Sequence, residues 1–174
     1  MQRLLFIPLI FLMLSCEDKQ DTTGTVSPSN LDGLYINEFL ASNSTTNVDE
    51  SGEYDDWLEL YNAGSDSIDL GGFFLTDTVD NLMKWSIPEG TIISAAGFLL
   101  VWCDEDQEQG DFHTNFKLSA GGEFIALVFS DGSTIIDSIS FGIQTVDISF
   151  GRISDGNISW DYFDTPTPNS SNEN

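Results

Sequence analysis

The chain has 174 residues, which is enough for one domain with extensions and too short for two ordinary domains. Its 29 Asp and Glu residues outnumber its 5 Lys and Arg residues, so the formal net charge is −24. Such a chain repels phosphate backbones, whose binding needs clustered cations, and nucleic acid is therefore excluded as an expected partner. The same charge favours divalent cations or basic proteins as partners, or a solvated acidic surface without any partner.

The N-terminus has the features of a secretory signal. One cation, Arg3, precedes an apolar run over residues 4–14, and Ser15 and Cys16 follow this run. The run is too short to cross a bilayer as a helix, because a crossing needs about 20 residues. Ser15 and Cys16 resemble the lipobox of bacterial lipoproteins, in which the cysteine becomes the lipidated first residue of the mature chain. We therefore expect residues 1–15 to be a lipoprotein-type signal peptide and Cys16 to carry a lipid.

The segment after Cys16 has the composition of a flexible acidic linker. Residues 17–33 consist mostly of Asp, Thr, Ser, Gly, Pro and Gln, which predicts a tether with a reach of roughly 20–25 Å. Together with the lipidated cysteine, this linker accounts for residues 16–33. The acidic run directly after the cysteine is also similar to surface-export tags of some outer-membrane lipoproteins, and a plain charged linker is the alternative. The expected location is the bacterial envelope, at the outer membrane.

From residue 34 onward, short extended segments alternate with turn-rich gaps, which is the pattern of an all-β sandwich or barrel. The expected strands are 34–40, 56–62, 73–76, 83–87, 97–103, 116–118, 123–129, 134–141 and 149–153. Residues 98–103 and 124–129 are apolar on both faces, which predicts two central strands. Asp-Gly pairs that end at Gly132 and Gly156 predict hairpin turns. Little helix is expected, because no window carries a 3.6-residue apolar period.

The strand 56–62 carries an unusual carboxylate. Its alternation places Leu58 and Leu60 on one face and Trp57 and Glu59 on the other. A carboxylate on a partly covered face needs a donor nearby, so we expect Glu59 to be hydrogen-bonded. Four polar residues of the first two strands are interpreted as a structural polar cluster: Glu38, Asp56, Glu59 and Asn62. A hydrolase that uses Glu38, Asp56 and Glu59 is an alternative that we do not prefer.

Oxygen-bearing side chains recur in residues 47–55 with the spacing of a calcium loop, and Gly52 stands at its sixth position. The candidate ligands are Asn47, Asp49, Ser51, Glu53 and Asp55. The twelfth position is Leu58, where an EF-hand has a bidentate Glu, and no helices flank the loop. Calcium binding is therefore a hypothesis, and a solvated acidic loop is its alternative. No other cofactor is expected.

The residues that could perform catalysis are few. His113 is the only histidine, and no G-x-S-x-G motif is present. We expect His113 to occupy a hydrogen-bonded position at a strand start and Cys103 to be a core thiol without a disulfide partner. No catalytic residue is predicted, and the chain is not expected to be an enzyme. Trp160 and Tyr162 are the candidates for an exposed aromatic face that binds glycans.

Several motifs resemble the lamin-tail domain in its bacterial form. They occupy residues 36–39, 56–62, 69–73, 84–88, 97–102, 113–119, 150–152 and 166–168. The resemblance spans residues 34–169 and implies an immunoglobulin-like β-sandwich with no known active site. Bacterial members of this family look like accessory modules on secreted or surface proteins. We assign residues 34–169 to this domain and residues 170–174 to a disordered tail.

The resemblance and the N-terminal signal together predict a non-catalytic, lipid-anchored interaction module at the bacterial cell envelope. The expected partners are the membrane, through the lipid, and an unidentified envelope protein or glycan. A calcium-dependent or glycan-binding adhesion module is the alternative function.

Overall fold

The computed structural model describes residues 31–172 and contains β-strands but no helix in this range. The strands are β1 (Leu34–Leu40), β2 (Trp57–Asn62), β3 (Ile68–Asp69), β4 (Phe74–Thr76), β5 (Trp85–Ser86), β6 (Ile92–Ile93), β7 (Phe98–Trp102), β8 (Phe124–Val128), β9 (Ile135–Ser140), β10 (Ser149–Arg152) and β11 (Trp160–Phe163). Nothing in this range is a helix of the length and apolarity that a membrane span requires. The predicted signal peptide, Cys16 and most of the predicted linker lie outside the described residues.

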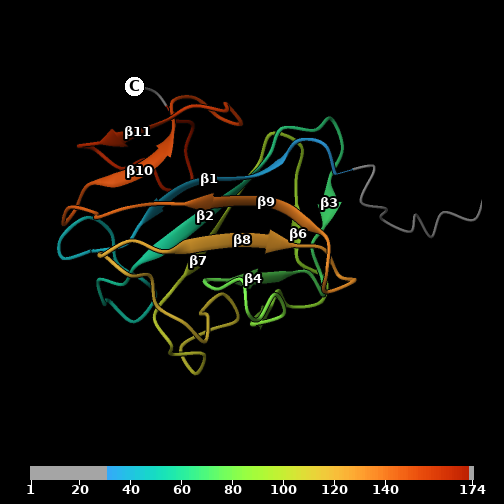
Figure 1. Ribbon diagram of the computed structural model, residues 1–174, viewed down its shortest axis with the longest axis horizontal. Coiled ribbons are helices and arrows are strands. Elements are labelled where there is room, and N and C mark those ends of the chain that lie inside the picture. Colours follow the sequence, from blue (N-terminus) through green and yellow to red (C-terminus); the bar gives the residue numbers. More distant parts are fainter. Residues whose placement is uncertain (1–30, 173–174) are drawn as a thin grey trace, which may run out of the picture.

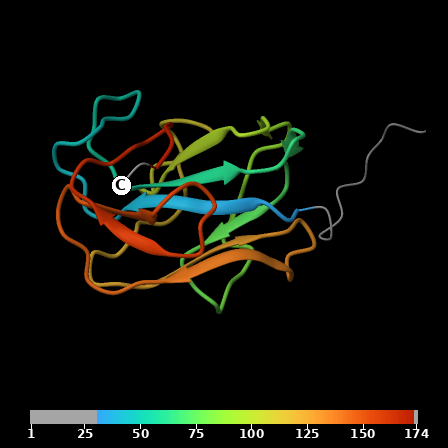
Figure 2. The ribbon, with the colours of Figure 1, turned by 90° about the horizontal axis from the view of Figure 1, so that it is seen from above.

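Two antiparallel sheets pack face to face around one core (Figures 1 and 2). The larger sheet has the order β11-β10-β1-β2-β7, the smaller has the order β5-β4-β8-β9, and β3 pairs with β6 in a separate ribbon. Phe39 and Leu60 of the larger sheet meet Leu75, Ile125 and Leu127 of the smaller sheet in the core. The expected all-β, immunoglobulin-like β-sandwich is confirmed.

Strand β2 is covered on both faces. Leu58 and Leu60 belong to the main core, as the alternation predicted. On the other face, Trp57 packs with Leu40 and Trp102 in a second, smaller apolar cluster. Glu59 therefore lies on the outer face of the larger sheet, yet it is fully buried.

Strand β1 contains a β-bulge at Asn37. Ile36 pairs with Leu60 and Glu38 pairs with Glu59, so Asn37 has no partner in β2. Strict alternation from Ile36 would direct Glu38 into the core, because side chains two residues apart share a face. The extra residue reverses this alternation. Phe39 therefore enters the core, and Glu38 lies opposite Glu59 on the outer face.

The backbone of Ile36, beside the bulge, is bound by side chains from two other strands. Its N–H donates to Asp137 Oδ2 of β9 at 2.8 Å, and its carbonyl accepts from Arg152 Nε of β10 at 2.8 Å. Arg152 Nη2 also donates to Asp137 Oδ2 at 2.8 Å. Arg152 is 7% exposed and Asp137 16% exposed, so this ion pair is largely buried. It connects the two sheets along one side of the sandwich.

Two strand predictions were wrong. Residues 116–118 form no strand, and only Lys117 makes an isolated bridge, to Asp104. Strand β7 is an edge strand of its sheet, whereas β8 is central as expected. At the C-terminal end of β7 a loop covers the open edge, because Trp102 N–H donates to the Phe112 carbonyl at 2.8 Å and Thr114 N–H donates to the Trp102 carbonyl at 2.9 Å. Residues Phe98–Leu100 of the same strand are only partly buried.

The turns lie where the sequence predicted them. Gly132 and Gly156 have φ angles of +70° and +68° in the two hairpin turns.

The folded domain extends beyond the predicted bounds at both ends. Leu31, assigned to the linker, is buried in the core. Asn172, assigned to a disordered tail, is 2% exposed and donates to the carbonyls of Asn37 and Arg152. The tail prediction was therefore wrong for residues 170–172, because the Asn172 amide satisfies buried backbone groups of β1 and β10.

Candidate functional site

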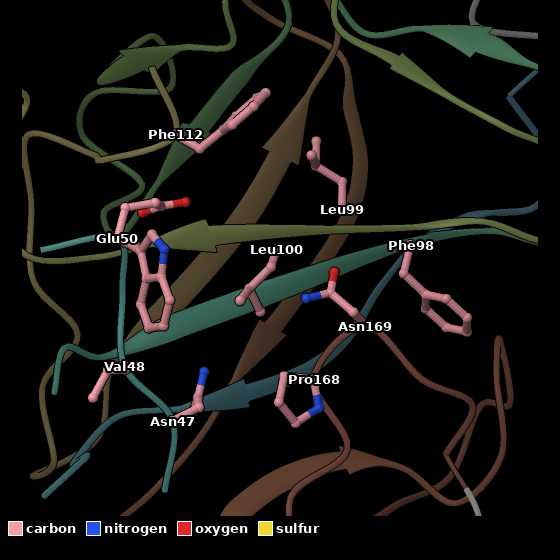
Figure 3. A pocket seen from close by; sticks show the side chains of 10 residues that line it. Asn47, Val48, Glu50, Phe98, Leu99, Leu100, Phe112, Pro168 and Asn169 are labelled. Atoms are coloured by element: carbon pink, nitrogen blue, oxygen red, sulfur yellow. The ribbon is translucent and has the colours of Figure 1, made fainter. Parts of the chain in front are cut away.

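A pocket of about 430 Å³ opens on the outer face of the larger sheet at the β7 edge (Figure 3). Three segments that are distant in the sequence line it: residues 47–50, β7 together with Phe112, and residues 168–169. The floor is apolar, and Asn47, Glu50 and Asn169 contribute polar groups. The sequence did not indicate this pocket, because residues 98–103 are apolar on both faces and predicted a strand that is covered on both sides.

The floor follows from the pairing of β7 with β2. Phe98 lies opposite Tyr61, and their rings stack with centroids 4.9 Å apart. Leu100 lies opposite Glu59, and Trp102 lies opposite Trp57. The outer faces of these two strands therefore form one largely apolar stripe. Trp57 and Trp102 are buried within it, and Phe98 and Leu100 are only partly covered. Phe98, Leu100 and Trp102 line the pocket.

A buried pair of carboxyl groups lies beside this stripe and holds the C-terminal wall of the pocket. Glu59 Oε2 accepts a hydrogen bond from the Asn169 backbone N–H, and Glu59 Oε1 has no partner within residues 31–172. Glu38 accepts from the hydroxyls of Ser149 and Thr167, the latter at 2.7 Å. Burial, and then the nearby charge of Glu38, raises the pKa of Glu59 to about 8. Burial also raises the pKa of Glu38.

The structure brings together only two of the four residues of the predicted polar cluster. Glu38 and Glu59 are cross-strand partners. Asp56 instead accepts the backbone N–H of Asn43 at 3.0 Å, and burial raises its pKa to about 6. Asn62 donates to the Asp66 carbonyl at 2.8 Å and so belongs to the turn after β2. Asp56, the third acid of the alternative hydrolase, therefore belongs to a different hydrogen-bonded group from Glu38 and Glu59.

The five predicted calcium ligands are used in different ways. Asn47 Oδ1 accepts the indole N–H of Trp57 at 2.8 Å. Asp49 Oδ1 accepts the backbone N–H groups of Ser51 and Glu53 at 2.9 and 2.7 Å, which closes the loop on itself. Glu53 accepts from the Gln109 amide at 3.1 Å. Asp55 Oδ2 is buried and unpartnered in the part of the chain that the structure describes.

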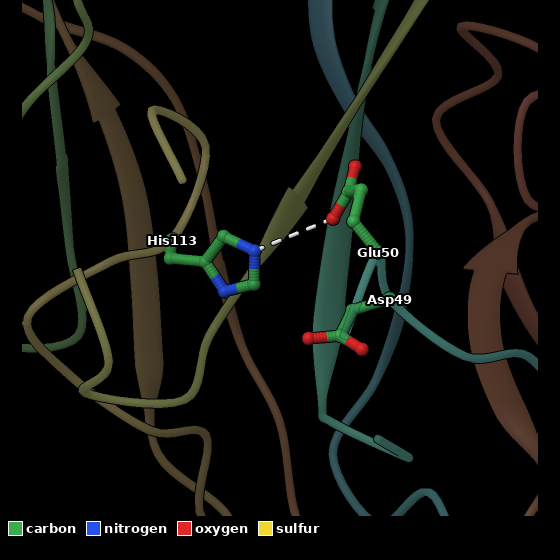
Figure 4. Close-up of side chains that lie close together, drawn as sticks. All are labelled: Asp49, Glu50 and His113. Atoms are coloured by element: carbon green, nitrogen blue, oxygen red, sulfur yellow. Dashed lines mark hydrogen bonds and ion pairs between the residues drawn. The ribbon is translucent and has the colours of Figure 1, made fainter. Parts of the chain in front are cut away.

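A different set of groups converges at this loop (Figure 4). Ligand atoms of Asp49, Glu50 and His113 lie within 4.8 Å of one another. His113 Nε2 is 3.5 Å from Glu50 Oε2, and His113 Nδ1 is 2.5 Å from Asp104 Oδ2. Burial opposes a charge on the imidazole, but the hydrogen bonds and charges of Asp104 and Glu50 raise the pKa of His113. Sequence reasoning identified Asp49 but missed the other two members. Glu50 lies between two positions of the calcium spacing, and His113 is 63 positions away from Glu50.

The remaining candidates occupy ordinary positions. Cys103 is a buried free thiol, and burial raises its pKa, as expected for a core thiol. His113 is hydrogen-bonded as predicted, although it lies in a loop that bridges to Trp102 rather than in a strand. The Trp160 ring is half-buried between the Phe150 ring at 5.4 Å and the Arg152 guanidinium at 4.9 Å. Of the two predicted exposed aromatics, only Tyr162 is exposed, at 47%.

The two packed antiparallel sheets and the bulged first strand define an immunoglobulin-like domain. The family model of the Lamin Tail Domain matches residues 27–142, and the chain belongs to this family. Strands β10 and β11 lie beyond the matched segment, although both belong to the larger sheet, where β10 pairs with β1 and β11 pairs with β10. No curated protein and no solved structure matches the chain. Family membership supports a non-catalytic, immunoglobulin-like interaction module.

Proposed function

We propose that this chain is a non-catalytic interaction module that a lipid on Cys16 holds at the bacterial envelope, at the outer membrane. The observation that supports the binding role is the pocket on the outer face of β7, where an apolar floor lies open between two loop walls. Loops on a rigid sandwich are common carriers of binding function. Beside the pocket on the same face, the C-terminal segment covers Glu38 and Glu59.

The chemistry of the pocket points to a protein segment with apolar and basic side chains. Phe98, Leu100 and Phe112 provide apolar surface that a partner side chain would cover. Glu50 adds a carboxylate at this pocket, and the whole chain carries a formal net charge of −24. A basic segment is attracted to such a surface, and an acidic one is repelled. The proposed partner is therefore an envelope protein that presents a basic, apolar segment.

Site-specific photo-crosslinking in intact cells tests this pocket. A photoreactive residue at Val48, which lines the pocket and is 46% exposed, should yield a discrete adduct with an envelope protein. The matched control is Ile158, which is 90% exposed in the β10–β11 turn and does not line the pocket. The control should give at most a tenth of the adduct. Equal yields at the two positions, or no adduct at Val48, would contradict the proposed binding role.

Replacing Cys16 with serine tests the membrane anchor. The unsubstituted chain should incorporate labelled fatty acid and sediment with membranes, because several acyl chains on one cysteine bind a bilayer firmly. Cys16→Ser should lose the label and move to the soluble fraction. Cys103→Ala should keep both properties, since Cys103 is a buried core thiol. Membrane sedimentation of Cys16→Ser to the same extent as the unsubstituted chain would remove the anchor from the proposal.

A glycan is the second candidate partner for the same pocket. The observation that favours it is the combination of aromatic side chains with the polar side chains of Asn47 and Asn169 around one opening. Aromatic rings with adjacent polar groups suit a ligand that is apolar on its ring faces and polar at its edges. The crosslinking experiment separates the two, because digestion of the adduct leaves a partner peptide attached at residue 48 if the partner is a protein and sugar residues if it is a glycan.

A further inference from the structure

His113 is held so that one ring nitrogen is fixed and the other faces the loop after β1. Its Nδ1 lies 2.5 Å from Asp104 Oδ2, and both side chains are only 2% exposed. When Nδ1 carries the proton and donates to Asp104, Nε2 presents a lone pair. Metal-binding histidines commonly have such a carboxylate behind them, because it fixes the tautomer and the ring orientation. The arrangement around His113 is therefore that of a positioned metal ligand.

Two carboxylates complete the set. Asp49 is 7% exposed, and its Oδ1 accepts two backbone N–H groups of its own loop. Its other oxygen, Oδ2, is buried without a hydrogen-bond partner among residues 31–172. A buried carboxylate oxygen without a donor is unfavourable, and a cation would compensate for it. Glu50 lies 3.5 Å from His113 Nε2 and is 79% exposed, so it makes only a weak contact and has freedom to adjust.

We propose that Asp49, Glu50 and His113 bind a divalent transition-metal ion of the Zn²⁺ type, with Asp104 as a positioning residue for His113. One imidazole nitrogen with two carboxylates matches the ligand types of Zn²⁺, and three protein ligands leave a position for water. Ca²⁺ instead takes about 6–8 oxygen ligands. This site shares only Asp49 with the calcium hypothesis. It does not depend on the proposed binding function.

A bound ion would add a connection between two loops that are distant in the sequence. Asp49 and Glu50 belong to the loop between β1 and β2, whereas His113 belongs to the loop after β7. Glu50 also lines the pocket, so the ion would lie beside it and hold one of its walls. Because the ion binds both loops only in the folded chain, it would stabilise the fold.

Direct metal binding to the full-length mature protein tests the site. After treatment with a chelator, the protein should bind one Zn²⁺ per chain in a calorimetric titration and raise its melting temperature. Co²⁺ should produce the visible absorption of a low-symmetry site with nitrogen and oxygen ligands. Glu50→Gln should weaken Zn²⁺ binding at least tenfold without loss of folding, because this side chain is exposed. Glu108→Gln, an exposed acid of the same loop as His113, has the same charge change and should bind normally.

Three results would overturn the site. Unchanged Zn²⁺ affinity in Glu50→Gln would show that these residues are not the ligands. Tighter binding of Ca²⁺ than of Zn²⁺ would favour an oxygen-only site at the loop. Absence of binding would indicate that His113 is simply protonated between Asp104 and Glu50. As a second variant, His113→Asn should abolish the Co²⁺ absorption, and an intense thiolate band that survives this substitution would assign the metal to a cysteine.

Discussion

Replacing Arg152 with alanine should lower the free energy of unfolding by about 3–5 kcal/mol, because it breaks a buried ion pair and leaves its partner uncompensated. The guanidinium donates to Asp137 and to the backbone carbonyls of Ile36 and Asn157. It also lies 4.9 Å from the ring centroids of Tyr35 and Trp160. The Ile36 carbonyl, beside the bulge in β1, would lose its hydrogen-bond donor at the same time. Urea denaturation followed by circular dichroism measures the loss.

Two control substitutions identify the cause of this loss. Arg152→Lys keeps the charge but lacks the planar fork of donors, so it should recover only part of the stability. Lys117→Ala removes an exposed cation and should change the free energy of unfolding by no more than about 0.5 kcal/mol. If Arg152→Ala costs no more than Lys117→Ala, the ion pair does not hold the sheets together.

The stability of this protein should fall as the pH rises from about 4.5 to about 8. Burial raises the pKa of Glu59 from 4.5 to about 8 in the folded chain, so the folded state binds more protons than the unfolded state in this window. The stabilisation that comes from the protonation of Glu59 is complete below pH 4.5 and is lost as the pH rises through about 8. One such group gives a slope of about 1.4 kcal/mol per pH unit. Glu59→Gln cannot ionise and should remove this slope.

Unfolding free energies of the variants, measured across this pH range, separate Glu59 from the other buried acids. Burial raises the pKa of Asp56 from 3.8 to about 6, so Asp56→Asn should flatten the profile only below about pH 6. Between about pH 6 and 8, the unfolding free energy of Asp56→Asn should fall with the same slope as that of the unsubstituted protein, whereas that of Glu59→Gln should not. Parallel profiles for Glu59→Gln and the unsubstituted protein would mean that Glu59 is already ionised at neutral pH.

Much of the fold was predictable, because its signals are local. The expected strand 34–40 coincides with β1, and the expected 56–62 differs from β2 by one residue. Both Asp-Gly turns occur where expected, because Gly132 and Gly156 provide the positive φ that such turns require. The two-residue strands β3 and β6 were missed, since two residues are too few to show an alternation.

The candidate site was predictable only in part. The loop 47–55 was identified as a place where acids gather, and Asp49 is indeed a member of the group at His113. The predicted co-ligands of Asp49 were residues of the same loop, because a sequence shows the spacing of residues within a segment but not which distant segments meet. In the structure two of those neighbours, Ser51 and Glu53, donate backbone N–H groups to Asp49 instead. The other two members of the group are Glu50 and His113, and His113 lies in the loop that follows β7.

The strand period, the turns and the apolar faces of β2 can be read from the chain's residue order alone, because each depends on residues within a few positions of one another, and the acidic character follows from composition. Which outer faces are covered depends on how the chain folds. One inserted residue in β1 moved Glu38 out of the core and opposite Glu59, and the C-terminal segment then covered both. The fold also places His113 beside Glu50. These contacts join segments separated by tens of residues, and the path of the whole chain decides whether such segments meet.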